Sequence, residues 1–219
     1  MLKIYGCYRS RASRNFWLMN ELGLAHDHVP VVQGYRLPDP SAPDAVLNTT
    51  SAAFLAINPA GTIPCIVDDG LILTESLAIN LYLARKTGGT LAPAGLAEEA
   101  LMLQWALFGA TMIEQAALEI YYPYAEKRTE TPEGKGQVGI AAAKLARPFR
   151  TLQAHLVANS HLVGGRFTVA DLNLAEIVRY AAAHVPLMDD NPAVAAWYAA
   201  CQARPGFKAM WAARMAEPA

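Results

Sequence analysis

The chain has 219 residues, which is enough for one large domain or two small ones. Hydrophobic residues make up 53% of the sequence, so a sizeable core can form, and 18 basic against 19 acidic residues leave a formal net charge of −1. No block of like charge stands out, which argues against a nucleic-acid surface, because such a surface needs a basic stripe.

The cysteines and the apolar segments indicate the compartment. Cys7, Cys65 and Cys201 occur without paired spacing, so we expect no disulfide framework. The chain opens directly into a strand-like run without a signal peptide, and no apolar run is long and uninterrupted enough to span a membrane. These features predict a reduced, soluble, cytoplasmic protein.

The first 86 residues alternate between strand and helix patterns. In chain order they predict a strand over 2–5, a helix over 10–22 closed by Gly23, a strand over 28–32, a proline-rich loop over 34–44, a helix over 46–56, strands over 65–67 and 71–73, and a helix over 75–86. Asp68-Asp69-Gly70 between the last two strands is a hairpin signal. The order is β-α-β-α-β-β-α.

Residues 87–94, with two glycines and Pro93, are typical of a linker, and the pattern after them is wholly helical. It predicts one long helix or two short ones over 96–127, a polar loop over 128–136, a helix over 137–158 kinked at Pro148, a helix from Thr168 to about 184, and two helices that start near Pro192 and Pro205. Thr168 followed three residues later by Asp171 is a capping-box signature.

Two motifs stand on either side of the expected hairpin. The loop over 58–64 ends in the step Ile63–Pro64, a candidate cis bond that turns the backbone groups of Ile63 outward, where an extended peptide can pair with them. Glu75 and Ser76 lie in the first turn of the following helix, where unpaired N–H groups and the helix dipole attract a carboxylate, and the Glu75 carboxylate suits an ammonium. A short peptide with an α-amino acid end suits all three: its backbone pairs with Ile63, its carboxylate binds at the helix start, and its ammonium binds Glu75.

At these residues the chain resembles the soluble glutathione S-transferase family, in its serine/cysteine-type, bacterial-like form. The family pattern asparagine-proline-x-glycine-x-(valine or isoleucine)-proline stands at 58–64, and glutamate-serine-x-alanine-isoleucine-x-x-tyrosine-leucine stands at 75–83. Several fixed positions at fixed spacing make the match specific. The resemblance implies a thioredoxin-like α/β glutathione-binding domain over 1–86, a linker over 87–94, and an all-α domain over 95–219 that lines the electrophile pocket.

The resemblance also implies a function. Family members conjugate the glutathione thiolate to an electrophilic small molecule in detoxification, and some reduce peroxides. We therefore expect glutathione as co-substrate, a hydrophobic electrophile, no metal and a symmetric homodimer, with neither nucleic acid nor a membrane as partner. In the family the capping motif lies in a buried helix and serves folding, so Asp171 is given a structural role.

The segment that joins the first strand to the first helix carries the candidate catalytic group. A free thiol has a pKa of about 8.5, so a helix N-terminus, nearby arginines and a hydrogen bond to the charged form are needed to favour its thiolate. Ser10, counted back from the end of the helix, stands where serine-type and cysteine-type family members keep their catalytic side chain, and Ser13 is the second choice. Arg11 and Arg14 add positive potential. The alternative for Ser10 is a helix cap alone, which uses the same location.

The remaining contacts are implied by the resemblance. Ile63, with Pro64, pairs its backbone with the cysteinyl unit of glutathione, Glu75 binds the ammonium of the γ-glutamyl end, and Ser76 binds its carboxylate. The glycyl carboxylate stays open among Gln33, Arg36 and Asn48.

Three side chains are candidates for the electrophile pocket: Tyr8, Phe108 and Met112. Phe108 and Met112 stand at helical spacing with Trp105, a pattern that fits either a core stripe or a pocket lining. Tyr8, in the first loop, is also a weaker candidate hydroxyl donor to the thiolate.

Two alternatives remain open. One is a glutathione-dependent thiol–disulfide oxidoreductase that uses Cys7, since cysteine two residues before Ser10 resembles a monothiol redox motif. Cys7 precedes the expected catalytic position by three residues, which favours a small buried hydrophobe instead. The other alternative is a non-catalytic binding protein on the same fold.

Overall fold

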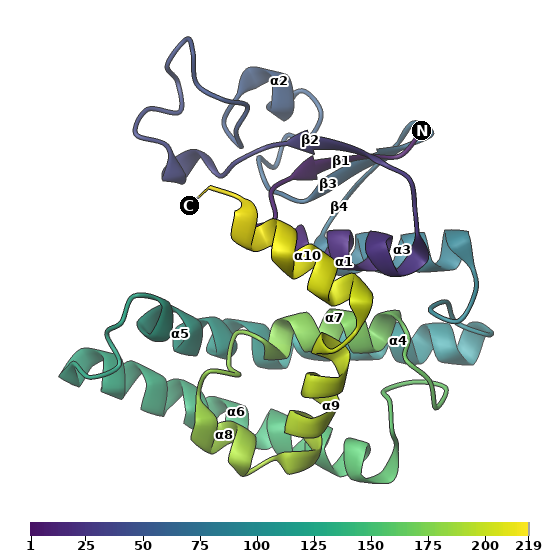
Figure 1. Ribbon diagram of the computed structural model, residues 1–219, viewed down its shortest axis with the longest axis vertical. Coiled ribbons are helices and arrows are strands. Elements are labelled where there is room, and N and C mark those ends of the chain that lie inside the picture. The colour runs from purple at the N-terminus through teal and green to yellow at the C-terminus, as the bar shows by residue number, and fades with distance from the viewer. Residues whose placement is uncertain (219) are drawn as a thin grey trace. The chain divides into compact units, whose positions relative to one another are not determined.

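The computed structural model describes residues 1–218 (Figure 1). It divides into two compact units, one made of Met1–Thr87 with the residues from Pro205 onward, the other of Gly88–Arg204. Each unit is described by itself below, as the sheet unit and the helical unit.

The sheet unit confirms the predicted order of strands and helices. Its elements are β1 (Lys3–Gly6), α1 (Ser13–Leu22), β2 (Asp27–Pro30), the 3-10 turn η1 (Gly34–Arg36), α2 (Ala52–Leu55), β3 (Cys65–Asp68), β4 (Leu71–Thr74), α3 (Ser76–Thr87) and α10 (Pro205–Ala216). The strands form one mixed sheet in the order β2-β1-β3-β4, in which β1 is parallel to β2 and antiparallel to β3. This is the thioredoxin-like arrangement expected from the sequence.

The sheet has a core on both faces because successive strand residues point to opposite sides. Tyr5 and Cys65 are paired in register, and on their face Phe54 of α2 packs with Cys65. Ile4 and Ile66, the next pair, are fully buried on the other face, where α1 and α3 lie (Figure 1). Full burial of side chains of this size contributes roughly 1.5–3 kcal/mol each.

Helix α1 is buried along most of its length because it lies between the sheet and α10. Trp17 is fully buried and meets Phe207 of α10 edge to face, with ring centroids 5.1 Å apart. The helix ends at Gly23, whose φ of 59° and N–H bonds to the last turn confirm the predicted C-cap. It begins at Ser13, three residues later than predicted, after turns that start at Ser10.

The predicted helix over 46–56 is wrong in its first half, since α2 covers only Ala52–Leu55. The Asn48 side chain donates to the carbonyls of Pro40 and Val46 and accepts from the Thr50 N–H and hydroxyl. These bonds satisfy backbone groups that a helix would otherwise pair, so the segment stays in a loop.

The helical unit contains α4 (Leu96–Phe108), the π-helical turn η2 (Gly109–Ile113), α5 (Glu114–Ala125), α6 (Pro132–Ala158), α7 (Val169–Val178), α8 (Val185–Asp189) and α9 (Pro192–Gln202). Two short helices joined by η2 therefore fill the span over 96–127. Pro192 opens α9 and Pro205 opens α10, as predicted.

Two helix boundaries in this unit differ from prediction. The polar stretch predicted as a loop over 128–136 contains the first turn of α6, because Thr131 caps the Gly134 N–H and Pro132 follows at the first helical position. The helix that opens at Thr168 ends at Val178 rather than near residue 184. Turns and the short α8 follow it.

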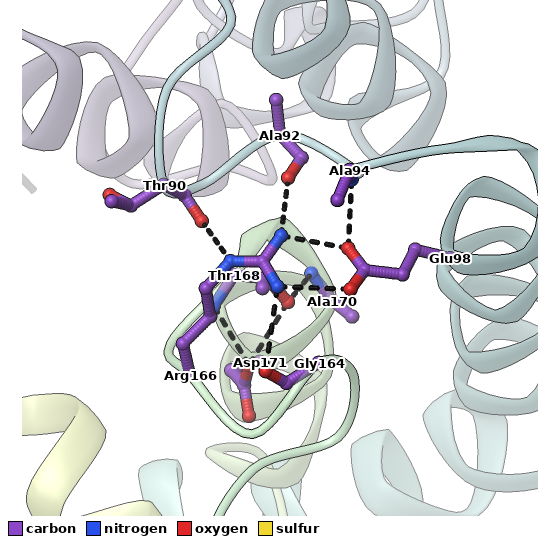
Figure 2. A network of polar contacts seen from close by, with 9 residues as sticks. All are labelled: Thr90, Ala92, Ala94, Glu98, Gly164, Arg166, Thr168, Ala170 and Asp171. Carbon is purple, nitrogen blue, oxygen red and sulfur yellow. Dashed lines mark hydrogen bonds and ion pairs between the residues drawn. The ribbon is translucent and has the colours of Figure 1, made fainter.

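The predicted capping box at Thr168 is confirmed, and Asp171 is a structural residue (Figure 2). Asp171 Oδ2 accepts from the Thr168 N–H at 2.9 Å and from its hydroxyl, while Oδ1 accepts from the Leu162 N–H and from Trp197 Nε1. The fully buried carboxylate thus ties the loop before α7 to α7 and α9.

Arg166 anchors the start of the helical unit (Figure 2). Its guanidinium forms a two-pronged ion pair with Glu98, at 3.0 and 2.7 Å, and donates to the carbonyls of Thr90 and Ala92. The Ala94 N–H also donates to Glu98. The hydrogen bonds from Arg166 and then Ala94 lower the pKa of Glu98 to about 2.

The Gly61 position yields a stability prediction. Gly61 has φ of 59°, and a Cβ there would lie 2.8 Å from the Thr49 carbonyl oxygen, whereas a Cβ at Gly23, also at φ 59°, would meet no described atom within 4 Å. We expect Gly23→Ala to lower the free energy of unfolding by about 1–2 kcal/mol for the left-handed conformation, and Gly61→Ala to lower it further. Urea denaturation measures both, and equal losses would contradict the clash with Thr49.

The Glu98 pair yields a pH prediction. The pKa of folded Glu98, about 2, lies below its ordinary value of 4.5, so the ionised carboxylate stabilises the fold above pH 4.5. This contribution is lost as the pH falls from 4.5 towards 2. We expect Glu98→Gln to lower the melting temperature at pH 7, and the difference from wild type to shrink below pH 4.5. Glu130→Gln is the control, because Glu130 pairs with Lys135 with 87% of its side chain exposed; a pH-independent Glu98→Gln difference would contradict the linkage.

Candidate functional site

Ser10 is held in the loop between β1 and α1 with its hydroxyl at the start of the helix. Its Oγ donates to the Cys7 carbonyl at 2.6 Å and accepts from the Ala12 N–H at 3.0 Å. The accepted bond fixes the oxygen, so rotation about the Cβ–Oγ bond alone redirects the hydroxyl hydrogen. Ser10 is half-buried and can meet a ligand.

The other candidate hydroxyl and the nearby cations lie in different surroundings. Ser13 is fully buried in the first turn of α1, which leaves it no surface for a ligand thiol. Arg11 is exposed, while Arg14 is 99% buried, since only 1% of it is accessible. Of the two serines, only Ser10 combines the helix start with accessibility.

The loop over 58–64 approaches the same place. The Ile63–Pro64 peptide bond is cis, as predicted. Gly6, at the end of β1, makes room for both segments, because a Cβ there would lie 2.9 Å from the Ala12 Cβ and 3.8 Å from both the Ile63 Cβ and the Pro64 Cα. Gly6 therefore lets the start of α1 lie against Ile63–Pro64.

Glu75 and Ser76 stand together at the start of α3, as predicted, with Glu75 exposed and Ser76 buried. Glu75 has φ of 67°, a left-handed conformation that costs a non-glycine residue on the order of 1–2 kcal/mol. Such strain tends to collect at ligand-binding positions.

A buried polar network joins the first turns of α1 and α3, and sequence reasoning missed it. Arg14 Nη1 donates to the Ser76 hydroxyl at 3.1 Å, and the Asn15 side chain donates to the Ser76 carbonyl at 2.9 Å. Asn15 also donates to Asn80, which in turn donates to the Arg14 carbonyl. The sequence carries only a weak signal for such a network, the polar run Ser13-Arg14-Asn15 directly before the apolar residues of the helix. The network positions Ser76.

A cavity of about 690 Å³ opens beside the β1–α1 loop within the sheet unit. Apolar side chains dominate its lining, among them Cys7, Tyr8, Leu37, Val46 and Ala213 of α10. The Tyr8 ring stacks on Phe16 with centroids 4.1 Å apart, which fixes the wall at Tyr8. Of the three side chains predicted for the electrophile pocket, Tyr8 lines this cavity.

Cys7 is a buried thiol in the lining of the same cavity. Its Sγ lies 3.5 Å from Gln33 Oε1, and only 2% of the residue is exposed. Burial, and then the nearby Glu217 carboxylate, raise the pKa of Cys7. The thiol form therefore dominates at neutral pH, and this is unlike a redox cysteine, whose pKa is lowered.

Glu217, just beyond α10, is a second residue that sequence reasoning missed. Its carboxylate accepts from the Tyr8 N–H at 2.9 Å and from the Arg9 N–H at 2.7 Å. Arg9 Nε donates back to the Glu217 carbonyl at 2.9 Å, and Arg214 donates to the Tyr8 carbonyl. Burial, and then Glu217, raise the pKa of Tyr8.

The three candidates for a glycyl carboxylate contact differ in accessibility. Asn48 is fully buried with its amide bonded inside its own loop. Gln33 is half-buried and bonds to Arg9 and Arg36, while Arg36 is exposed. Gln33 and Arg36 therefore stay candidates for the glycyl carboxylate contact, and Asn48 does not.

Comparison with known proteins identifies the family. The model of the glutathione S-transferase N-terminal domain matches residues 8–86, and that of the C-terminal domain matches residues 109–205. Glutathione S-transferase 3 from Zea mays is 31% identical over 217 residues, covering 94% of this chain and 91% of that protein. The chain belongs to the glutathione S-transferase family. As a member it is an enzyme, a glutathione transferase.

Solved structures of glutathione S-transferases share the whole fold. Glutathione S-transferase III in its apo form is 32% identical, with a TM-score of 0.78 over 100% of this chain and 99% of that one. Glutathione transferase F7 from Populus trichocarpa is 26% identical, with a TM-score of 0.79 over 98% of this chain and 99% of that one. The thioredoxin-like and all-helical parts predicted from the sequence are thus those of the glutathione S-transferase fold.

The other two predicted pocket residues of this glutathione S-transferase lie in the helical unit. Phe108, half-buried, meets Trp105 edge to face at 5.4 Å, and Met112 is 48% exposed on η2. Both stay predictions for the electrophile pocket.

The described part of the chain, residues 1–218, holds neither a candidate metal-binding group nor a helix that could span a membrane. In that part of the chain, no three His, Cys, Asp or Glu side chains gather into a metal-binding group. None of the helices described there combines the length and the apolar character that crossing a bilayer requires.

Proposed function

We propose that this glutathione transferase binds glutathione in the sheet unit and uses Ser10 to stabilise its thiolate for attack on a hydrophobic electrophile. The observation that carries the proposal is the buried network from Arg14 and Asn15 to Ser76, which holds the first turns of α1 and α3 together. Ser10 lies one helical turn before Arg14, so a ligand bound at Ser76 is within reach of the Ser10 loop.

Glutathione would meet three kinds of group. In the described part of the chain, neither backbone group of Ile63 takes part in a turn or loop hydrogen bond, which suits pairing with the cysteinyl unit beside Pro64. The exposed Glu75 carboxylate suits the α-ammonium. The Ser76 hydroxyl, backed by the Arg14 guanidinium, suits the α-carboxylate.

The thiolate would lie at the N-terminus of α1. Ser10 would exchange its bond to the Cys7 carbonyl for one to sulfur, while the Ala12 N–H keeps the oxygen in place. A hydrogen bond to the charged form, the helix start and the cation of Arg11 all lower a thiol pKa. The burial of Ser13 favours Ser10 as the donor.

The electrophile would occupy the cavity beside Tyr8. The thiolate sulfur attacks the electrophilic carbon and a carbon–sulfur bond forms. In a substitution the leaving group departs with its electron pair; in an addition the π bond breaks and the neighbouring carbon takes a proton from water. Holding both reactants in place makes the attack effectively intramolecular.

The alternatives have less support. A redox role for Cys7 is disfavoured by its burial and its raised pKa. Peroxide reduction would use the same thiolate and stays a second activity to assay. The proposal also includes a symmetric homodimer and a cytoplasmic location. It assigns glutathione binding to residues 1–86 and part of the electrophile pocket to residues 95–219, with a linker over 87–94.

Glutathione binding tests the site. We expect Glu75→Ala to weaken glutathione binding by at least about tenfold, about 1.4 kcal/mol, because the ammonium loses its counter-charge. Calorimetry on the wild type and the variant measures this. Glu133→Ala, in the first turn of α6, is the matched control for a general loss of acidic charge. Unchanged affinity in Glu75→Ala would remove Glu75 from the site.

Thiol ionisation tests Ser10. We expect Ser10→Ala to raise the pKa of bound glutathione and to lower kcat/KM about a hundredfold, the usual loss for one donor to a developing anion, with little change in glutathione affinity. Thiolate absorbance titrated against pH, together with conjugation kinetics, measures both. The same titration on Ser13→Ala decides between the hydroxyls, since a larger effect there would reverse the assignment.

A further inference from the structure

The contact between Glu217 and the β1–α1 loop resembles a bound ligand more than a helix cap. Both carboxylate oxygens are engaged, one by each of two consecutive backbone N–H groups, at 2.9 and 2.7 Å. Hydrogen bonds from N–H to a carboxylate are roughly twice as strong as neutral ones. The Tyr8–Arg9 peptide segment therefore presents a complete receptor for one carboxylate.

This receptor belongs to the wall of the 690 Å³ cavity, since Tyr8 and Glu217 both line it. The volume lies within the range of small-molecule sites, about 300–1,000 Å³. A ligand in the cavity thus lies beside Tyr8, whose N–H holds the Glu217 carboxylate together with the N–H of the next residue, Arg9.

The charges around the receptor favour an anion. Arg9 donates to the Glu217 carbonyl, Arg214 donates to the Tyr8 carbonyl, and Arg36 lines the cavity. Glu217 is the acidic side chain among the described lining residues. If its carboxylate left, the described lining of the cavity would keep the Arg36 cation and no acidic side chain, which favours an anion in its place.

Glu217 can be displaced when a ligand carboxylate remakes its two hydrogen bonds to the Tyr8 and Arg9 N–H groups. It follows the last residue of α10, Ala216, and is only half-buried. Its displacement breaks no contact of the apolar core of α10, where Phe207 and Met210 are the buried anchors.

We propose that the Tyr8 and Arg9 N–H groups form a carboxylate site for the second substrate, which Glu217 occupies until an electrophile bearing a carboxylate replaces it. The substrate class is then an organic acid with an apolar body that fills the cavity and an electrophilic carbon, such as a halogenated aromatic acid or an unsaturated carboxylic acid. This inference deepens the proposed function and rests on it, because it assigns the cavity to the electrophile.

A matched pair of unreactive probes tests the exchange without glutathione. The probes 3,5-dinitrobenzoate and 3,5-dinitrobenzamide share shape and differ in charge, and calorimetry gives their affinities for the full chain. We expect Glu217→Ala to raise the preference for the benzoate over the benzamide by at least about tenfold, because the competing carboxylate is gone. Glu217→Gln, whose amide fits only one of the two N–H groups, gives an intermediate rise and serves if Glu217→Ala does not fold. Met215→Ala, on an exposed position of α10, leaves the preference unchanged.

The location of binding is read from amide resonances. In ¹⁵N-labelled Glu217→Ala or Glu217→Gln protein, the benzoate is expected to move the Tyr8 and Arg9 signals towards their wild-type positions, because its carboxylate restores the two hydrogen bonds. Equal changes in affinity for both probes, or Tyr8 and Arg9 signals that ignore saturating benzoate, would overturn the carboxylate site.

A failure here is separable from a failure of the proposed function. Conjugation of the uncharged electrophile 1-chloro-2,4-dinitrobenzene, assayed on the wild type and Ser10→Ala, reports on glutathione and Ser10 alone. If conjugation depends on Ser10 but the Glu217 variants bind the benzoate and the benzamide with unchanged preference, only the carboxylate site is contradicted.

Discussion

The buried hydrogen bonds between α1 and α3 are the constraint on which the site depends. A guanidinium is strongly destabilised inside a protein unless its surroundings supply acceptors, so Arg14 fixes where the start of α3 lies. Asn15 and Asn80 extend the bonding along both helices, which sets their register as well as their distance. The sheet supplies the platform, with Gly6 admitting Ala12 close to Ile63. The positions of Ser10, Ile63 and Ser76 are thus consequences of packing rather than of three independent loops.

The helical unit is also held together by a buried charged side chain with hydrogen bonds to neighbouring segments, in this case an acidic one. Asp171 is fully buried, and its two oxygens accept four hydrogen bonds, from a loop N–H, from the Thr168 backbone and side chain, and from the Trp197 indole. Arg166 and Glu98 then hold the segment before α4 against the loop before α7. Each unit therefore has a buried, hydrogen-bonded ionic group near the start of one of its helices. The apolar cores around these groups tolerate exchange of similar side chains more readily than the ionic groups do.

The sequence predicted those features that depend on contacts between residues close together in the chain. The Thr168 capping box, the Gly23 C-cap and the proline at the start of α9 each involve neighbours within a few residues, and all three are confirmed. The failed helix over 46–56 depends on Asn48 bonding to Pro40, eight residues away, which no helical period reveals. The partner of the β1–α1 loop, Glu217, lies 208 residues from Arg9. The family motifs are local and therefore predict a glutathione side of the site, while the contacts around the cavity beside Tyr8 are long-range and need the folded chain.

The aromatic wall at Tyr8 has a consequence for how the cavity adapts. The Tyr8 ring stacks on Phe16, which is itself fully buried in α1, and both rings meet His28 at steep angles. The Tyr8 ring can turn only when α1 yields, whereas exposed side chains such as Arg36 change rotamer within picoseconds to nanoseconds. The cavity wall is therefore rigid at Tyr8 and adaptable at Arg36. Compounds that differ in outline on the Tyr8 side will be told apart by shape, and those that differ on the Arg36 side will be accommodated alike.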